Sequence, residues 1–132
     1  MMTLDVRTQR RCEFVDVTRQ VEACVAEAGI QRGLCVCFVP HTTAGVTIQE
    51  NADPNVTRDL DHKLTELIPH HDPGYRHAEG NSDAHLKSSL LGASQTLLVQ
   101  NGRLVLGTWQ AVYFAEFDGP RHRKMHVDVI GD

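Results

Sequence analysis

Polar side chains that could do chemistry are concentrated in two segments, residues 75–85 and 40–54. The first reads YRHAEGNSDAH and has one tyrosine as its only large side chain. It cannot build a hydrophobic core, so it is either a solvated loop or part of a site. The second reads PHTTAGVTIQENADP and places a histidine, a glutamate and an aspartate close in sequence. We interpret the chain as a scaffold that brings the two segments together.

Three histidines of these segments, His41, His77 and His85, are candidate ligands of a divalent metal ion. Neutral imidazoles suit zinc, and three protein ligands with one open position form the arrangement of a catalytic zinc site. Magnesium is the alternative ion if the substrate carries a diphosphate. The spacing of His77 and His85 matches no general ligand motif, so loop histidines that only form hydrogen bonds are the competing interpretation.

Four carboxylates near these histidines, Glu50, Asp53, Glu79 and Asp83, are candidates for catalysis. Each could act as a general base or accept a hydrogen bond from a histidine ring. Glu50 would point inward at the end of a strand, where a salt bridge competes with a role in the site. Asp53 precedes Pro54, so a helix N-cap competes with a role as a ligand.

A basic cluster follows Gly119-Pro120 and consists of Arg121, His122, Arg123 and Lys124. Arg121 and Arg123 could hold a phosphate through bidentate contacts. The alternative is that they pair with Glu116 and Asp118. The residues expected to bind substrate or phosphate are Thr42, Thr43, Asn51, Asn81, Ser82, Arg121 and Arg123.

Composition excludes several classes of protein. The 132 residues fit one domain, and the net charge of −4 gives no footprint for binding nucleic acid. The four cysteines form neither a CxxC pair nor a zinc-ribbon spacing. No stretch approaches the roughly 20 apolar residues of a membrane span, and no apolar signal segment opens the chain. We expect a soluble, cytoplasmic protein with reduced cysteines and no membrane partner.

The hydrophobic pattern predicts seven or eight strands and three helices. The predicted strands are 3–10, 12–15, 33–39, 46–50, 94–100, 103–109, 108–118 and 124–130, and the predicted helices are 18–28, 54–68 and 82–91. The first two strands should form a hairpin, and Asn101-Gly102 should form another. Thr18 should cap the first helix, while Leu86 and Leu90 should face inward on the third. The segregation of strands and helices favours an α+β fold, an antiparallel β-sandwich with about three helices inserted in the first two thirds.

The strand at 108–118 has apolar side chains on both faces. Both faces should therefore be covered, by the opposing layer or by a neighbouring subunit.

Three blocks of the chain resemble the signature blocks of the YjbQ-like family, described as secondary thiamine-phosphate synthase enzymes. They read HTTAGVTIQENADPNVTRD, YRHAEGNSDAHLKSSLLG and GRLVLGTWQAVYFAEFDGPRHR. The resemblance extends over residues 5–130. One departure is the stretch LLVQNG, where the family often has a proline, and it affects only a strand edge.

The resemblance implies a small α+β protein that assembles as a homotrimer, with strand 108–118 partly at the subunit boundary. It implies a pocket around His41, His77 and His85 that holds a metal, zinc in some members. The implied activity joins a pyrimidine methyl diphosphate to a thiazole phosphate and releases pyrophosphate. The chain lacks an aspartate-rich magnesium patch, so a metal-dependent hydrolase and a non-catalytic metal- or anion-binding trimer stay open as alternatives.

Overall fold

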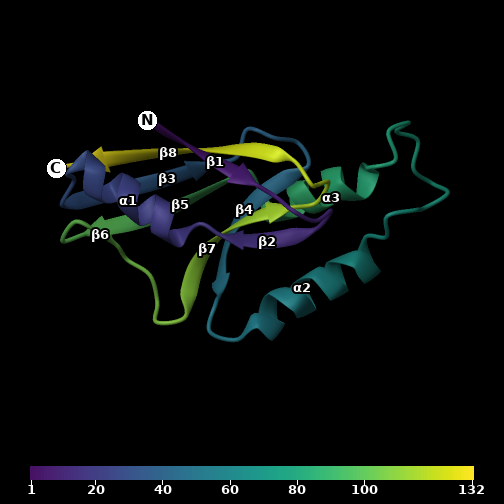
Figure 1. Ribbon diagram of the computed structural model, residues 1–132, viewed down its shortest axis with the longest axis horizontal. Coiled ribbons are helices and arrows are strands. Elements are labelled where there is room, and N and C mark those ends of the chain that lie inside the picture. Colours follow the sequence, from purple (N-terminus) through teal and green to yellow (C-terminus); the bar gives the residue numbers. More distant parts are fainter.

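Two antiparallel sheets pack against each other in a computed structural model that describes all 132 residues (Figure 1). The five-stranded sheet has the order β1 (Met2–Arg7), β8 (His122–Gly131), β3 (Arg32–Phe38), β5 (Ser94–Gln100) and β6 (Arg103–Leu104). The three-stranded sheet has the order β2 (Glu13–Asp16), β7 (Gln110–Glu116) and β4 (Ala44–Glu50). The helices are α1 (Thr18–Ala28), α2 (Pro54–Leu67) and α3 (Ser82–Leu91). The expected α+β sandwich with three helices is confirmed.

A cluster of 17 buried apolar residues fills the space between the two sheets and α1. Strand alternation produces it, because every second residue points to the same face of a sheet. Cys35 and Cys37 of β3 and Met125 and Val127 of β8 are fully buried in this way. The two cysteines are thus small core residues, as expected.

The N-terminal strands do not form the expected hairpin. β1 pairs with β8 along its whole length, whereas β2 pairs with β7 in the other sheet. The N–H of Thr8, in the crossing between the sheets, donates to the carbonyl of Arg121 at 2.9 Å. No two-residue turn sequence joins the strands, so pairing with distant strands decides their positions.

Thr18 is the first residue of α1 rather than its N-cap. The N-cap is Val17, which has no side-chain capping hydrogen bond, and Oδ1 of the preceding Asp16 accepts from the N–H of Thr18 at 3.0 Å. The hydroxyl oxygen of Thr18 accepts from the N–H of Val112 at 2.9 Å and ties the helix to the central strand β7. Gly29 ends the helix with a positive φ of 69°.

β7 is buried on both faces within one chain. Val112 and Phe114 belong to the main core, while Ala115 and the following Phe117 form a smaller apolar cluster with Ala84 of α3. The opposing layers therefore cover this strand, and it gives no support for a subunit boundary.

The Asn101-Gly102 hairpin is present, with φ values of 53° and 74°. The strand that follows, β6, has two residues instead of the seven expected. The chain instead turns at Gly107, whose N–H donates to the side chain of Gln110 at 2.7 Å.

α3 packs against β4 with a polar face, contrary to expectation. Leu86 and Leu90 are 48% and 66% exposed, whereas Asp83 and Lys87 are buried. The prediction that the leucines face inward was wrong. Arg11 and Lys87 neutralise Asp83, so the charged face of the helix can be buried instead.

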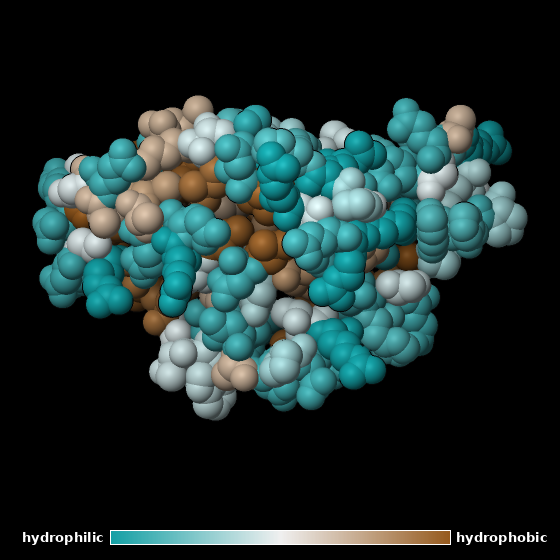
Figure 2. All heavy atoms as spheres, viewed as in Figure 1, coloured by the Kyte–Doolittle hydropathy of each residue, from teal (hydrophilic) through white to brown (hydrophobic).

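α2 lies at the edge of the molecule, where Leu64 packs against the smaller apolar cluster, and none of its residues is fully buried (Figure 1). Hydrophilic side chains gather over the end of the molecule that carries α2 and the loop leading to α3 (Figure 2). None of the three helices has the length and apolar character that crossing a membrane requires.

Candidate functional site

An open cavity lies where the end of β3, the start of α3 and the connection between β7 and β8 meet. Its volume of about 550 Å³ is within the range of small-molecule sites. The lining residues are Phe38, Val39, Pro40, His41, Thr42, Thr43, Glu79, Asn81, His85, Ala93, Arg121 and Arg123. The two polar segments found in the sequence therefore meet, and the basic cluster joins them.

His41 follows β3, and the backbone of β8 holds its ring. The N–H of Lys124 donates to Nε2 of His41 at 3.0 Å, and a backbone N–H can only donate. A neutral imidazole that accepts at Nε2 carries its proton on Nδ1. Burial, and then the charge of Arg123, lower the pKa of His41, which keeps the ring neutral at pH 7. His41 thus offers an N–H donor rather than a cation.

Arg123 and Glu116 form a buried ion pair beside the cavity. Nε of Arg123 lies 2.9 Å from Oε1 of Glu116, and its Nη2 donates to the hydroxyl of Thr43 at 2.8 Å. Burial raises the pKa of Glu116, but the hydrogen bonds from Arg123 and Thr8 lower it more, so the carboxylate is ionised. Arg123 therefore pairs with Glu116, which was the alternative to phosphate binding, and the hydroxyl of Thr43 helps to hold its guanidinium.

Arg121 keeps part of its guanidinium free at the rim of the cavity. Its Nε donates to the carbonyl of Asp118 at 2.8 Å, and its Nη2 donates to the carboxylate at 3.0 Å. The side chain is 53% exposed, and its Nη1 has no partner in the chain. Asp118 is ionised, since burial raises its pKa but hydrogen bonds from Asn81 and Arg121 lower it more. Asp118 thus orients Arg121 without using all its donors.

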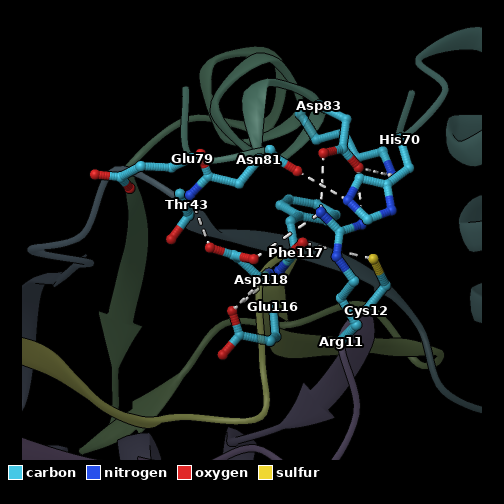
Figure 3. Close-up of polar contacts among 12 residues, drawn as sticks. Arg11, Cys12, Thr43, His70, Glu79, Asn81, Asp83, Glu116, Phe117 and Asp118 are labelled. Carbon is cyan, nitrogen blue, oxygen red and sulfur yellow. Dashed lines mark hydrogen bonds and ion pairs between the residues drawn. The ribbon is translucent and has the colours of Figure 1, made fainter. Parts of the chain in front are cut away.

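A second buried network lies at the start of α3 (Figure 3). Two nitrogens of Arg11 bind the two oxygens of Asp83, each at 2.9 Å. Nζ of Lys87 lies 3.6 Å from Asp83 and 5.8 Å from the centre of the Phe117 ring. Burial raises the pKa of Asp83, but Arg11 lowers it more. Asp83 is therefore an ionised anchor of the helix and not a free base.

The three candidate histidines do not form a metal site in the single chain. No group of three or more His, Cys, Asp or Glu side chains is placed to hold an ion. With Nε2 accepting from Lys124 and Nδ1 protonated, the ring of His41 has no free lone pair. His77 and His85 lie edge to face with ring centres 5.2 Å apart, and Glu79 lies 3.7 Å from His77. The expected three-histidine set therefore does not fit a metal as it stands.

His77 and Ser82 line a neighbouring hollow rather than the main cavity. The rings of His70 and His71 stack there with centres 4.1 Å apart. Nε2 of His70 lies 2.9 Å from the carbonyl oxygen of Gly80. The expected histidine site is thus divided between two hollows.

Glu50, Asn51 and Asp53 lie at or beyond the far end of β4, separated from the cavity by roughly 20 Å of strand. Glu50 is half-buried at the strand end, and its carboxylate forms no ion pair. Asp53 caps α2, since its Oδ1 accepts from the N–H of Asn55 at 2.9 Å and Pro54 follows it. Within one chain these three residues do not line the cavity.

Arg11 and Lys87, which hold α3 beside the cavity without lining it, were not expected from the sequence. Charged residues are usually exposed, and Arg11 lies in a basic stretch near the start of the chain. The one available signal was the four-residue spacing of Asp83 and Lys87, which places opposite charges on the same face of a helix.

The comparisons with known proteins agree with the fold. A family model described as UPF0047 protein YjbQ-like matches residues 2–132. The UPF0047 protein YugU of Bacillus subtilis (strain 168) is 50% identical over 131 residues, which are 99% of each chain. The UPF0047 protein MJ1081 of Methanocaldococcus jannaschii is 50% identical over 127 residues, 96% of this chain and 91% of its own.

Solved structures of two similar proteins have the same fold. An uncharacterized conserved protein from Clostridium acetobutylicum matches with a TM-score of 0.97 and 49% identity, over 98% of this chain and 100% of that one. The conserved hypothetical protein TT1486 from Thermus thermophilus matches with a TM-score of 0.92 and 51% identity, over the same shares. The names of these relatives state no activity.

Proposed function

Because the chain belongs to the UPF0047 YjbQ-like family, and the names of its relatives state no activity, we propose a function from the cavity itself. The protein is an enzyme that acts on a phosphorylated small molecule. The observation that carries this proposal is Arg121, which Asp118 holds at the rim of a cavity with its Nη1 unpaired.

Three features of the cavity suit a phosphate. The free part of the Arg121 guanidinium can bind phosphate oxygens with charge-assisted hydrogen bonds. The Nδ1–H of His41 is a second donor without a partner in the chain. The N-terminal end of α3, at Asn81, lies in the wall of the cavity and adds the positive end of a helix dipole.

In the proposed reaction, Arg121 neutralises the phosphate or diphosphate that leaves. His85 lines the same cavity with its ring nitrogens unpaired, so it can exchange a proton with the substrate. The first pair to test is the one implied by the family resemblance, a pyrimidine methyl diphosphate with a thiazole phosphate. There the C–O bond to the diphosphate breaks, pyrophosphate leaves with the electron pair, and the thiazole nitrogen forms the new C–N bond. No step of this scheme uses a metal.

The test is an assay for released pyrophosphate and phosphate, with that pair and with a panel of phosphate monoesters. Arg121→Gln should lower kcat/KM roughly a hundredfold, the usual effect of losing a donor to developing negative charge. Arg58→Gln, at an exposed arginine of α2, is the matched control and should leave turnover unchanged.

Two results would contradict the proposal. Full activity of Arg121→Gln would remove its central residue. Binding of phosphate compounds by the wild-type protein with no turnover of any of them would make it an anion-binding protein rather than an enzyme.

We also propose that the protein forms a homotrimer through the outer face of the five-stranded sheet. Leu98, Leu34 and Ile130 are neighbours across β5, β3 and β8, and they are 60%, 42% and 59% exposed. Phe38, also exposed, lies on the same face and lines the cavity. An exposed apolar row of this kind is typical of a protein interface.

Light scattering tests this assembly and should give three times the mass of one chain. Leu34→Lys should reduce the mass to that of one chain, while Leu67→Lys on the exposed side of α2 should not. A wild-type monomer at micromolar concentration would contradict the proposal.

A further inference from the structure

Asn81 has a buried polar atom with no hydrogen-bond partner in the chain. Its Oδ1 is the one buried side-chain nitrogen or oxygen left unpaired, and the residue is 7% exposed in the wall of the cavity. Burying a carbonyl oxygen without a donor is costly, so native structures leave few such atoms. This oxygen therefore requires a partner from outside the chain.

Asp118 fixes the orientation of the Asn81 amide. Nδ2 of Asn81 donates to Oδ2 of Asp118 at 2.8 Å (Figure 3). A carboxylate only accepts, so turning the amide over would place two oxygens against each other. Asn81 occupies the N-cap position of α3, yet its side chain makes no capping hydrogen bond. The free oxygen is thus neither a misassigned amide nor a helix cap.

We infer that Oδ1 of Asn81 accepts a hydrogen bond from a hydroxyl or amino group of the phosphorylated ligand, which makes Asn81 a specificity-determining residue. This inference rests on the proposed function, because it concerns the same cavity. It adds a substrate class: a phosphate compound that carries a hydrogen-bond donor close to its phosphate.

Asp118 holds the side chains of Asn81 and Arg121 close together. Nδ2 of Asn81 and Nη2 of Arg121 bind the same oxygen, at 2.8 Å and 3.0 Å, so these two nitrogens are at most 5.8 Å apart. The phosphate-binding group and the free carbonyl are therefore close neighbours. The free atoms, Oδ1 of Asn81 and Nη1 of Arg121, belong to the same two planar groups, so one small molecule can reach both, and a three-carbon spacing is the first to test.

The test compares two probes that differ by one hydroxyl group, 3-hydroxypropyl phosphate and propyl phosphate. A hydroxyl probe is better than an amine, because the exposed carboxylate of Glu79 in the same cavity would attract an ammonium group. Calorimetry on the wild-type protein should show the hydroxyl compound binding about tenfold more tightly. Asn81→Leu, of similar volume and without an acceptor, should abolish the difference. Ser89→Ala, in the adjoining hollow, should retain it.

The wild-type comparison decides the question even if Asn81→Leu fails to fold. Equal affinities for the two probes would overturn the inference, because water would then satisfy the carbonyl, while phosphate binding itself would still support the proposed function. If neither probe nor inorganic phosphate binds, the proposed function fails and the inference fails with it.

Discussion

Replacing Glu116 by glutamine should destabilise the protein strongly without changing the shape of the side chain. The carboxylate accepts hydrogen bonds from Arg123, from the hydroxyl of Thr8 and from the N–H groups of Phe117 and Asp118. Glutamine substitutes an NH₂ group for one acceptor oxygen, so at least one of these donors loses its partner. The charge of Arg123 stays buried without a counter-ion.

The size of the effect can be worked out from these contacts. Removing one partner of a buried ion pair costs about 3–5 kcal/mol. The hydroxyl of Thr43 still accepts from Arg123 in the variant, so we expect a loss near the lower end, about 3 kcal/mol in the free energy of unfolding. The double variant Glu116→Gln with Arg123→Met should be more stable than Glu116→Gln alone, because it removes both charges.

Urea unfolding at pH 7 measures the difference, with the exposed pair of Lys63 and Glu66 as a control. Lys63→Ala removes a surface ion pair and should cost at most about 1 kcal/mol. The pH dependence adds a second reading. Since the folded state lowers the pKa of Glu116, the ion pair stabilises the protein above the ordinary value of 4.5, and this contribution disappears as the pH falls through the lower folded pKa. A cost below 1 kcal/mol for Glu116→Gln would refute the reasoning.

Three further predictions concern packing, pH and metal. Gly45→Ala would bring a Cβ within 2.8 Å of the Gly92 carbonyl oxygen and should cost about 1–3 kcal/mol in urea unfolding, whereas Gly74→Ala meets only a side-chain oxygen and should cost less. The folded state lowers the pKa of His41, so its neutral ring should stabilise the protein above pH 6.5, the ordinary pKa, and this contribution should be lost as the pH falls through the folded pKa. In His41→Gln the urea midpoint of unfolding should therefore vary less with pH over this range. Treatment with EDTA should leave phosphate affinity unchanged in calorimetry, because the contacts of Arg121 need no metal. A tenfold drop in affinity would show that a metal ion takes part in phosphate binding.

Local signals in the sequence predicted the parts of the fold that local chemistry controls. Asn101-Gly102 forms its turn because both residues tolerate positive φ, and Asp53 caps α2 because a proline follows it. The burial of Cys35 and Cys37 follows from strand alternation, which needs no knowledge of the partner strands. The meeting of segments 40–54 and 75–85, by contrast, depends on the fold, and it was only partly predictable. Their polar composition indicated a site, but only the near ends of the two segments share the cavity.

Features that depend on partners far away in the chain could not be predicted from local sequence patterns. β1 and β2 are joined by a short connection, yet they enter different sheets because β8 and β7, far along the chain, offer them pairing edges. The outward leucines of α3 have the same cause. Nothing near Asp83 in the sequence shows that Arg11 will neutralise it, so the hydrophobic pattern favoured burying Leu86 and Leu90.

The buried charges also explain how the cavity keeps its shape. α3 docks through Asp83, Lys87 and Arg11 rather than through its leucines, so its position depends on charges being paired. Arg11 also lies 3.9 Å from Asp118, the carboxylate that orients both Asn81 and Arg121.

One chain of ionic contacts therefore runs from the docking of α3 to the two groups proposed to bind the ligand. Paired charges have fixed geometry, whereas an apolar face could slide, so this arrangement suits a site that must hold a donor and a phosphate at a set distance. Removing the ion pair between Arg11 and Asp83 should then reduce ligand affinity as well as stability, although Arg11 does not line the cavity.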